Sequence, residues 1–170
     1  MKNTLEIDLN YILKLSKKRE KENSNFRMFL KGEDSKKLDK IVHPLEQEIS
    51  SQIDCKECAN CCKKLHPALT NEELKVLSGI KNMSVNAFKL KYVEKDPYDQ
   101  KLYLKHTSCI FLKDKVCSVY EQRPEPCRSY PNIHKSAFSS RSMVMMENYG
   151  ICPIVFNVIE RLKLELNYRY

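Results

Sequence analysis

Four of the eight cysteines in this chain fall in one eight-residue stretch, Cys55-Lys56-Glu57-Cys58-Ala59-Asn60-Cys61-Cys62. Its pattern, C-x2-C-x2-C-C, places a thiol at about every third residue, so a turn or short helix directs several sulfur atoms into one small volume. Metal ions favour such a concentration of thiolates, whereas hydrophobic packing rarely needs it. We therefore expect a metal site at this stretch. We also expect the fold to bring the later cysteines back to it, namely Cys109, Cys117, Cys127 and Cys152.

Two kinds of metal centre fit these cysteines. Structural zinc is held by four thiolate or imidazole ligands, usually supplied as C-x2-C pairs, and eight cysteines suffice for two such sites. A [4Fe–4S] cluster also takes four cysteines, and C-x2-C-x2-C with a remote Cys-Pro is a familiar ligand arrangement. Here Cys55, Cys58 and Cys61 form the run and Cys152-Pro153 is the remote pair. This match favours iron slightly over zinc.

The division of the cysteines between centres stays open. Cys61 and Cys62 are adjacent, so their side chains diverge. If Cys61 serves one centre, Cys62 either faces a second centre or is simply packed. The partners in such a second centre would be members of the set Cys109, Cys117 and Cys127. A disulfide framework is the alternative to metal, because the number of cysteines is even.

The compartment bears on that choice. Residues 1–22 hold no apolar stretch long enough for a signal peptide or a membrane span, and no later segment does either. We expect a cytoplasmic protein without a membrane partner, and cytoplasmic thiols stay reduced.

Arg123 and Arg128 flank Cys127 and are candidate cofactor-binding residues. Their guanidinium groups could hydrogen-bond to thiolates or sulfides, or bind an anionic substrate. The alternative is that they pair with carboxylates and stiffen the proline-rich loop. His66, four residues after Cys62, is a weaker candidate for a ligand.

The formal net charge of +8 by itself favours nucleic acid, an anionic surface or an acidic partner. Each metal-bound thiolate subtracts one charge, however, and the lysines are scattered along the chain. We therefore interpret most of the charge as a solvated surface. The metal ion or cluster is the expected partner, a protein partner stays open, and nucleic acid is a less favoured alternative.

Hydrophobic periodicity predicts a mostly helical α+β fold with a small β-hairpin, held together by a cysteine-ligated metal centre. We expect an N-terminal helical arm over residues 1–34 and a cysteine-cluster metal-binding domain over residues 35–170. Helices are predicted over 4–21, with an interruption at 23–25, then to Gly32, over 35–53 leading directly into Cys55, after Thr70, after Ser84 and after Pro153. A hairpin or three-stranded meander is predicted within 102–120, and an extended, non-helical path over 123–131.

Taken together, these motifs resemble the CxxCxxCC cysteine-cluster family, also called YkgJ-like, whose members are described as zinc- or iron-chelating proteins. The resemblance covers about residues 35–165. It rests on the cysteine run, on Cys109-Ile110-Phe111-Leu112, on Cys117-Ser118-Val119-Tyr120, on Arg123-Pro124, Cys127-Arg128 and Tyr130-Pro131, and on Cys152-Pro153. It implies metal chelation by the eight cysteines.

Catalysis is left open by this resemblance. A flagellin lysine N-methylase is similar in its cysteine cluster, which implies S-adenosylmethionine-dependent methyl transfer to a protein lysine as an alternative function. A redox enzyme that acts on another substrate belongs to the same alternative. A basic zinc module that binds nucleic acid is a third.

Overall fold

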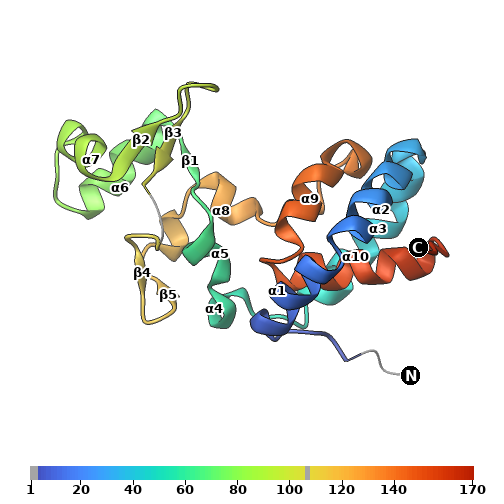
Figure 1. The fold of residues 1–170 in the computed structure, drawn as a ribbon. Coiled ribbons are helices and arrows are strands. Elements are labelled where there is room, and N and C mark those ends of the chain that lie inside the picture. Colours follow the sequence, from blue (N-terminus) through green and yellow to red (C-terminus); the bar gives the residue numbers. More distant parts are fainter. Residues whose placement is uncertain (1–3, 106–107) are drawn as a thin grey trace. The chain divides into compact units, whose positions relative to one another are not determined.

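The computed structural model describes residues 4–105 and 108–170. Contacts divide the chain into two compact units (Figure 1). We call Met1–Asp54 with Pro131–Tyr170 the helical unit, and Cys55–Tyr130 the cysteine unit. Helices predominate and the strands form two small antiparallel sheets, which confirms the predicted α+β class.

The predicted domain boundary after residue 34 lies at neither junction of these units and stays a prediction, and residues 1–3 of the predicted arm lie outside the described residues. Among the residues described, no helix combines the length and the apolar character needed to cross a membrane.

Side-chain caps start several helices of the helical unit. The Asp8 carboxylate accepts hydrogen bonds from the first N–H groups of α1, and the Asp34 carboxylate accepts from Lys37 N–H at 2.7 Å at the start of α3. Helix α10 lies against α3, and nine of its 13 residues are buried, so it forms the centre of this unit. The elements are α1 (Leu9–Lys18), α2 (Glu20–Gly32), α3 (Ser35–Ser50), the 3₁₀ helix η2 (Phe138–Arg141), α9 (Ser142–Asn148) and α10 (Pro153–Glu165).

Two predictions for this unit are wrong. Helix α2 continues through residues 23–25, where an interruption was expected, because Asn23 is buried and its side-chain oxygen accepts a hydrogen bond from Lys163 at 2.7 Å. This tertiary contact outweighs the weak helix propensity of asparagine. Helix α3 passes through Pro44 but ends at Ser50, so it does not lead directly into Cys55.

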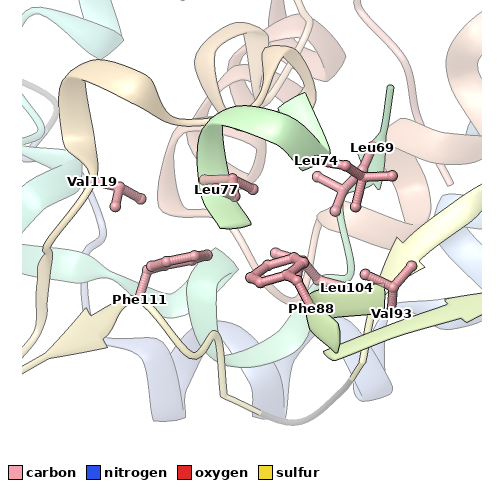
Figure 2. Packing of buried hydrophobic residues seen from close by; sticks show 8 residues of the cluster. All are labelled: Leu69, Leu74, Leu77, Phe88, Val93, Leu104, Phe111 and Val119. Carbon is pink, nitrogen blue, oxygen red and sulfur yellow. The ribbon is translucent and has the colours of Figure 1, made fainter. Parts of the chain in front are cut away.

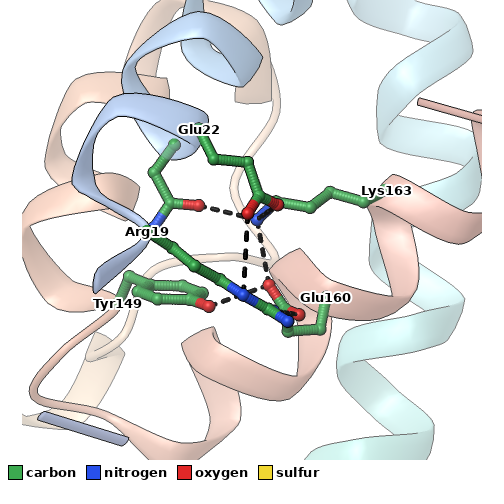
Figure 3. Close-up of polar contacts among 6 residues, drawn as sticks. Arg19, Glu22, Tyr149, Glu160 and Lys163 are labelled. Atoms are coloured by element: carbon green, nitrogen blue, oxygen red, sulfur yellow. Dashed lines mark hydrogen bonds and ion pairs between the residues drawn. The ribbon is translucent and has the colours of Figure 1, made fainter. Parts of the chain in front are cut away.

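A polar network joins α2 and α10 inside the helical unit (Figure 3). The Lys163 ammonium donates to carboxylate oxygens of Glu22 at 2.7 Å and of Glu160 at 3.0 Å. Tyr149 O–H donates to Glu160 at 2.8 Å, and Arg19 forms an ion pair with the same carboxylate. Because Lys163 is only 6% exposed, these partners are what allow its charge to be buried.

The cysteine unit begins with two short helices and contains both sheets. A capping box starts α6, as predicted: Thr70 Oγ accepts from Glu73 N–H, and Glu73 accepts from Thr70 N–H at 2.7 Å. Ser84 caps α7, also as predicted. The elements are α4 (Cys55–Cys58), α5 (Asn60–Lys64), β1 (Ala68–Leu69), α6 (Asn71–Ile80), α7 (Val85–Tyr92), β2 (Val93–Lys95), β3 (Leu102–Leu104), β4 (Leu112–Lys113), β5 (Val116–Cys117), η1 (Tyr120–Gln122) and α8 (Glu125–Ser129).

The strands pair differently from the predicted meander. Strand β3 lies between β1 and β2, with Leu104 opposite Val93, whereas β4 pairs with β5 in a second sheet. Asp114 and Lys115 link β4 to β5 and both have positive φ, as a two-residue hairpin turn requires. The predicted extended path around Cys127 is wrong: with Pro124 before it and Pro126 in its first turn, α8 forms there, since proline is tolerated where helix N–H groups have no intrahelical partner.

One apolar core supports the cysteine unit (Figure 2). Its buried members are Leu69, Leu74, Leu77, Phe88, Val93, Leu104, Phe111 and Val119. Cys109 and Cys117 pack against this core and flank Phe111, which is 1% exposed. Burial of Phe111 therefore fixes the backbone of the segment that carries the candidate ligands Cys109 and Cys117.

Candidate metal centre

The cysteine run occupies two consecutive short helices. Cys55 and Cys58 begin and end α4, whereas Cys61 and Cys62 lie in the first turn of α5. Ala59 separates the helices with a left-handed backbone, φ 48°, which costs a non-glycine residue roughly 1–3 kcal/mol. This reversal makes the run two helical turns rather than one continuous helix.

Cys62 is held beside Cys109 by the backbone. The Cys109 N–H donates to the Cys62 carbonyl oxygen at 2.9 Å, although the two residues are 47 positions apart. Cys117 lies in β5 opposite Leu112, and the Ser118 N–H and hydroxyl both donate to the Phe111 carbonyl oxygen, at 2.8 and 3.0 Å. The hairpin thus returns Cys117 toward the segment that carries Cys109.

Charge coupling shows that these thiols share one neighbourhood. Burial raises the pKa of Cys109, and the negative charges of Cys62 and Cys117 raise it further. Burial also raises the pKa of Cys127 to about 12, together with the charges of Cys109, Cys62 and Cys117. Cys127 is nevertheless an exposed residue. We call Cys62, Cys109, Cys117 and Cys127 the four-thiol group.

Cys62 differs from Cys109 and Cys127 in the direction in which its pKa is shifted. A hydrogen bond from the Cys61 thiol lowers the pKa of the Cys62 thiol to about 7, helped by a backbone N–H and the Lys63 charge and opposed by burial. Thiolates are the form that binds metals, so the lowered pKa makes the Cys62 thiolate available near neutral pH.

The four-thiol group does not form a preassembled site for a single metal ion among the described residues. Within residues 4–105 and 108–170, no three cysteine, histidine or carboxylate side chains stand close enough together to hold one metal ion. All eight cysteines belong to the described part of the chain, and none of them forms a disulfide. The structure therefore contains thiols that form no disulfide and influence one another electrostatically.

The remaining predicted ligands lie elsewhere. Cys55, Cys58 and Cys61 accompany Cys62 on α4 and α5. Cys152 belongs to the helical unit, where it precedes α10, is 6% exposed, and donates its N–H to the Asn148 carbonyl oxygen at 2.9 Å. Its assignment as a ligand stays a prediction.

The two predicted arginines have different surroundings. Arg123 lies over the Tyr120 ring, with 3.7 Å between its guanidinium carbon and the ring centre, and donates to the Tyr120 carbonyl oxygen. Its charge acts to lower the pKa of Cys127, so it lies within electrostatic reach of the four-thiol group. Arg128 instead pairs with Glu125 at 3.6 Å on the surface. His66 faces Glu94 at 3.9 Å.

Two residues near the site, Tyr120 and Lys56, make contacts that the sequence analysis did not predict. Tyr120 was noted only as part of a motif, yet its ring also lies beneath the Lys56 ammonium, with 4.7 Å between that nitrogen and the ring centre. A tyrosine and an arginine three positions apart, between two cysteines, is a usable signal for Tyr120. Nothing in the sequence marks Lys56, because its contact joins segments that are distant along the chain.

The cysteine unit therefore has the character of a small metal-chelating module, in which soft sulfur donors from several chain segments meet over one apolar core. A family model described as CxxCxxCC, a putative zinc- or iron-chelating domain, matches residues 54–148, more than half of the chain. This chain belongs to that family, as its motifs predicted. No solved structure matches the chain significantly.

Proposed function

We propose that the four-thiol group binds an iron–sulfur cluster of the [4Fe–4S] type. The observation that carries the proposal is the arrangement of these thiols. They come from separate chain segments and are near enough to shift one another's pKa. Sulfurs around one zinc lie about 3.8 Å apart, given tetrahedral bonds of about 2.3 Å, whereas a four-iron cluster takes its cysteines from a wider volume.

The donor set suits iron chemically. Four cysteine thiolates are the usual ligands of such a cluster, and here they come from α5, β5, α8 and the segment before β4. When bound, a cluster supplies one-electron redox chemistry and cross-links the chain segments that hold it. The residues of the chain hold the ligands in place. The backbone hydrogen bond between Cys109 and Cys62 joins two of the ligand-bearing segments, and the buried Phe111 anchors the hairpin.

Zinc is the second candidate, because the family description names zinc and iron alike. For zinc, the same four thiols would have to draw together on binding. Methyl transfer to a protein lysine, redox catalysis and nucleic-acid binding stay predictions from the sequence.

Anaerobic purification followed by iron, sulfide and zinc analysis tests the proposal. Iron and acid-labile sulfide in similar amounts, with broad visible absorption, would support a cluster. Stoichiometric zinc in a colourless protein would instead show that zinc is the bound metal. Protein without stoichiometric metal after anaerobic reconstitution would overturn both candidates.

Cysteine-to-serine variants separate two possible ligand sets. We expect Cys109→Ser, from the four-thiol group, to lose iron, because each thiolate of a four-cysteine cluster is a required ligand. Cys58→Ser is the matched control from the alternative set, Cys55, Cys58, Cys61 and Cys152. If Cys58→Ser loses the iron while Cys109→Ser keeps it, the C-x2-C-x2-C run is the binding site and our assignment is wrong.

A further inference from the structure

Tyr120 forms a platform for two cations beside the four-thiol group. Its ring lies beneath the Arg123 guanidinium at 3.7 Å and beneath the Lys56 ammonium at 4.7 Å, both measured to the ring centre. Attraction between a cation and an aromatic face holds each charge near the ring. The Arg123 guanidinium is fixed a second time by its hydrogen bond to the Tyr120 carbonyl oxygen.

The chain places this platform next to the candidate ligands. Tyr120 comes three residues after Cys117, and Arg123 comes four residues before Cys127. The Cys127 N–H donates to the Pro124 carbonyl oxygen at 2.9 Å, so the backbone turns back on itself between Arg123 and Cys127. Lys56 lies between Cys55 and Cys58 on α4, which contacts β5, the strand that carries Cys117.

A metal centre with four thiolates needs positive charge nearby. Four thiolates leave two negative charges on a divalent ion, and cysteine-ligated clusters respond to nearby charge through their reduction potential. We propose that Arg123 and Lys56, fixed over Tyr120, are positioning residues that offset the negative charge of the metal-loaded four-thiol group. This inference rests on the proposed function and adds the residues that regulate its site.

The contacts of Lys56 and Arg123 with the Tyr120 ring also connect two segments of the chain. Lys56 belongs to the cysteine run, whereas Tyr120 and Arg123 belong to the loop between Cys117 and Cys127. The platform therefore couples the position of α4 to the loop that connects Cys117 and Cys127, two members of the four-thiol group. Removing the ring should release both cations at once.

The test uses full-length protein reconstituted anaerobically with ferrous iron and sulfide. Cluster retention is measured by competition with an iron chelator, and the reduction potential by spectroscopic titration. We expect Arg123→Gln to weaken cluster retention about 10- to 100-fold, because substitution of a residue just outside the ligand shell commonly has an effect of this size. Its reduction potential should become more negative, because a positive charge that favours the reduced cluster has been removed.

Matched variants separate charge from folding. Lys40→Gln removes one positive charge at an exposed position on α3, in the helical unit, so we expect retention and potential like those of the wild type. Arg123→Lys keeps the charge and should restore part of the potential. Tyr120→Phe keeps the ring and should behave as the wild type, whereas Tyr120→Leu should resemble Arg123→Gln. Lys56→Gln, at an exposed position, should shift the potential in the same direction.

The outcomes distinguish the inference from the proposed function. A wild-type protein that takes up no cluster would overturn the proposed function and this inference with it. A wild type that binds a cluster, with Arg123→Gln unchanged in retention and potential, would overturn the inference alone. Equal behaviour of Tyr120→Phe and Tyr120→Leu would show that the ring is not the platform. Circular dichroism of each metal-free variant reports whether the fold is intact.

Discussion

Replacement of Lys163 by methionine should be one of the most damaging single substitutions in the helical unit. The Lys163 ammonium makes three hydrogen bonds, to Glu22 at 2.7 Å, to Asn23 at 2.7 Å and to Glu160 at 3.0 Å. Methionine fills a similar volume but leaves two largely buried carboxylates facing each other (Figure 3).

The magnitude follows from the burial of the partners. Removing one member of a buried ion pair costs about 3–5 kcal/mol of unfolding free energy, because an uncompensated charge is left behind. The side chains of Glu22 and Glu160 are 20% and 26% exposed, and Arg19 still neutralises part of their charge, so we expect the lower end, about 3 kcal/mol. For a chain of this length the melting temperature should fall by about 6–12 °C.

Urea denaturation followed by far-ultraviolet circular dichroism measures this loss. Lys40→Met, at an exposed position on α3, is the matched control and should change the unfolding free energy little. Adding Glu160→Gln to Lys163→Met should recover part of the loss, because one of the opposed charges disappears. A Lys163→Met variant as stable as Lys40→Met, or a double variant whose losses simply add, would refute the reasoning.

Three further predictions concern acid stability, the core and a helix cap. Burial acts to raise the pKa of Glu160, but Lys163, Tyr149 and Arg19 lower it below its usual value of 4.5. Because the folded-state pKa lies below the unfolded one, the stabilisation is present above about pH 4.5 and is lost as the pH falls through the folded-state pKa. Glu160→Gln should therefore show a flatter dependence of unfolding free energy on pH below 4.5, and a slope equal to that of the wild type would contradict the prediction. Phe111→Ala should cost about 3–5 kcal/mol of unfolding free energy and also weaken metal retention, since Cys109 and Cys117 pack against the core that Phe111 completes; chelator competition that leaves retention unchanged would separate the core from the site. Thr70→Ala should cost about 1 kcal/mol of unfolding free energy through loss of the α6 cap, whereas Thr70→Ser should cost little because the hydroxyl is kept; equal losses in urea denaturation would count against the capping box.

Local patterns predicted the local structure well. Asp34 and Pro153 mark the starts of α3 and α10, and Thr70 and Ser84 cap α6 and α7, because caps act between residues only a few positions apart. The hairpin turn between β4 and β5 was found for the same reason. The cysteine run indicated the family, since thiols that recur this densely in a chain have few other uses.

Predictions failed where a distant contact decides the conformation. Asn23 favours an interruption by its own propensity, but its hydrogen bond to Lys163 lies across 140 positions and keeps α2 continuous. Strand β3 pairs with β1, for which the sequence predicted no strand, because pairing depends on which edges meet in the folded unit.

The sequence by itself determined the donor chemistry, the helical character and the family, because these depend on residue types and short spacings. Only the tertiary structure decided which thiols influence one another. Cys62 and Cys109 are joined by a backbone hydrogen bond across 47 positions, and burial and shared charge, which no spacing encodes, link them to Cys117 and Cys127. The same holds for the contact of Lys56 with the Tyr120 ring, which forms because α4 lies against β5.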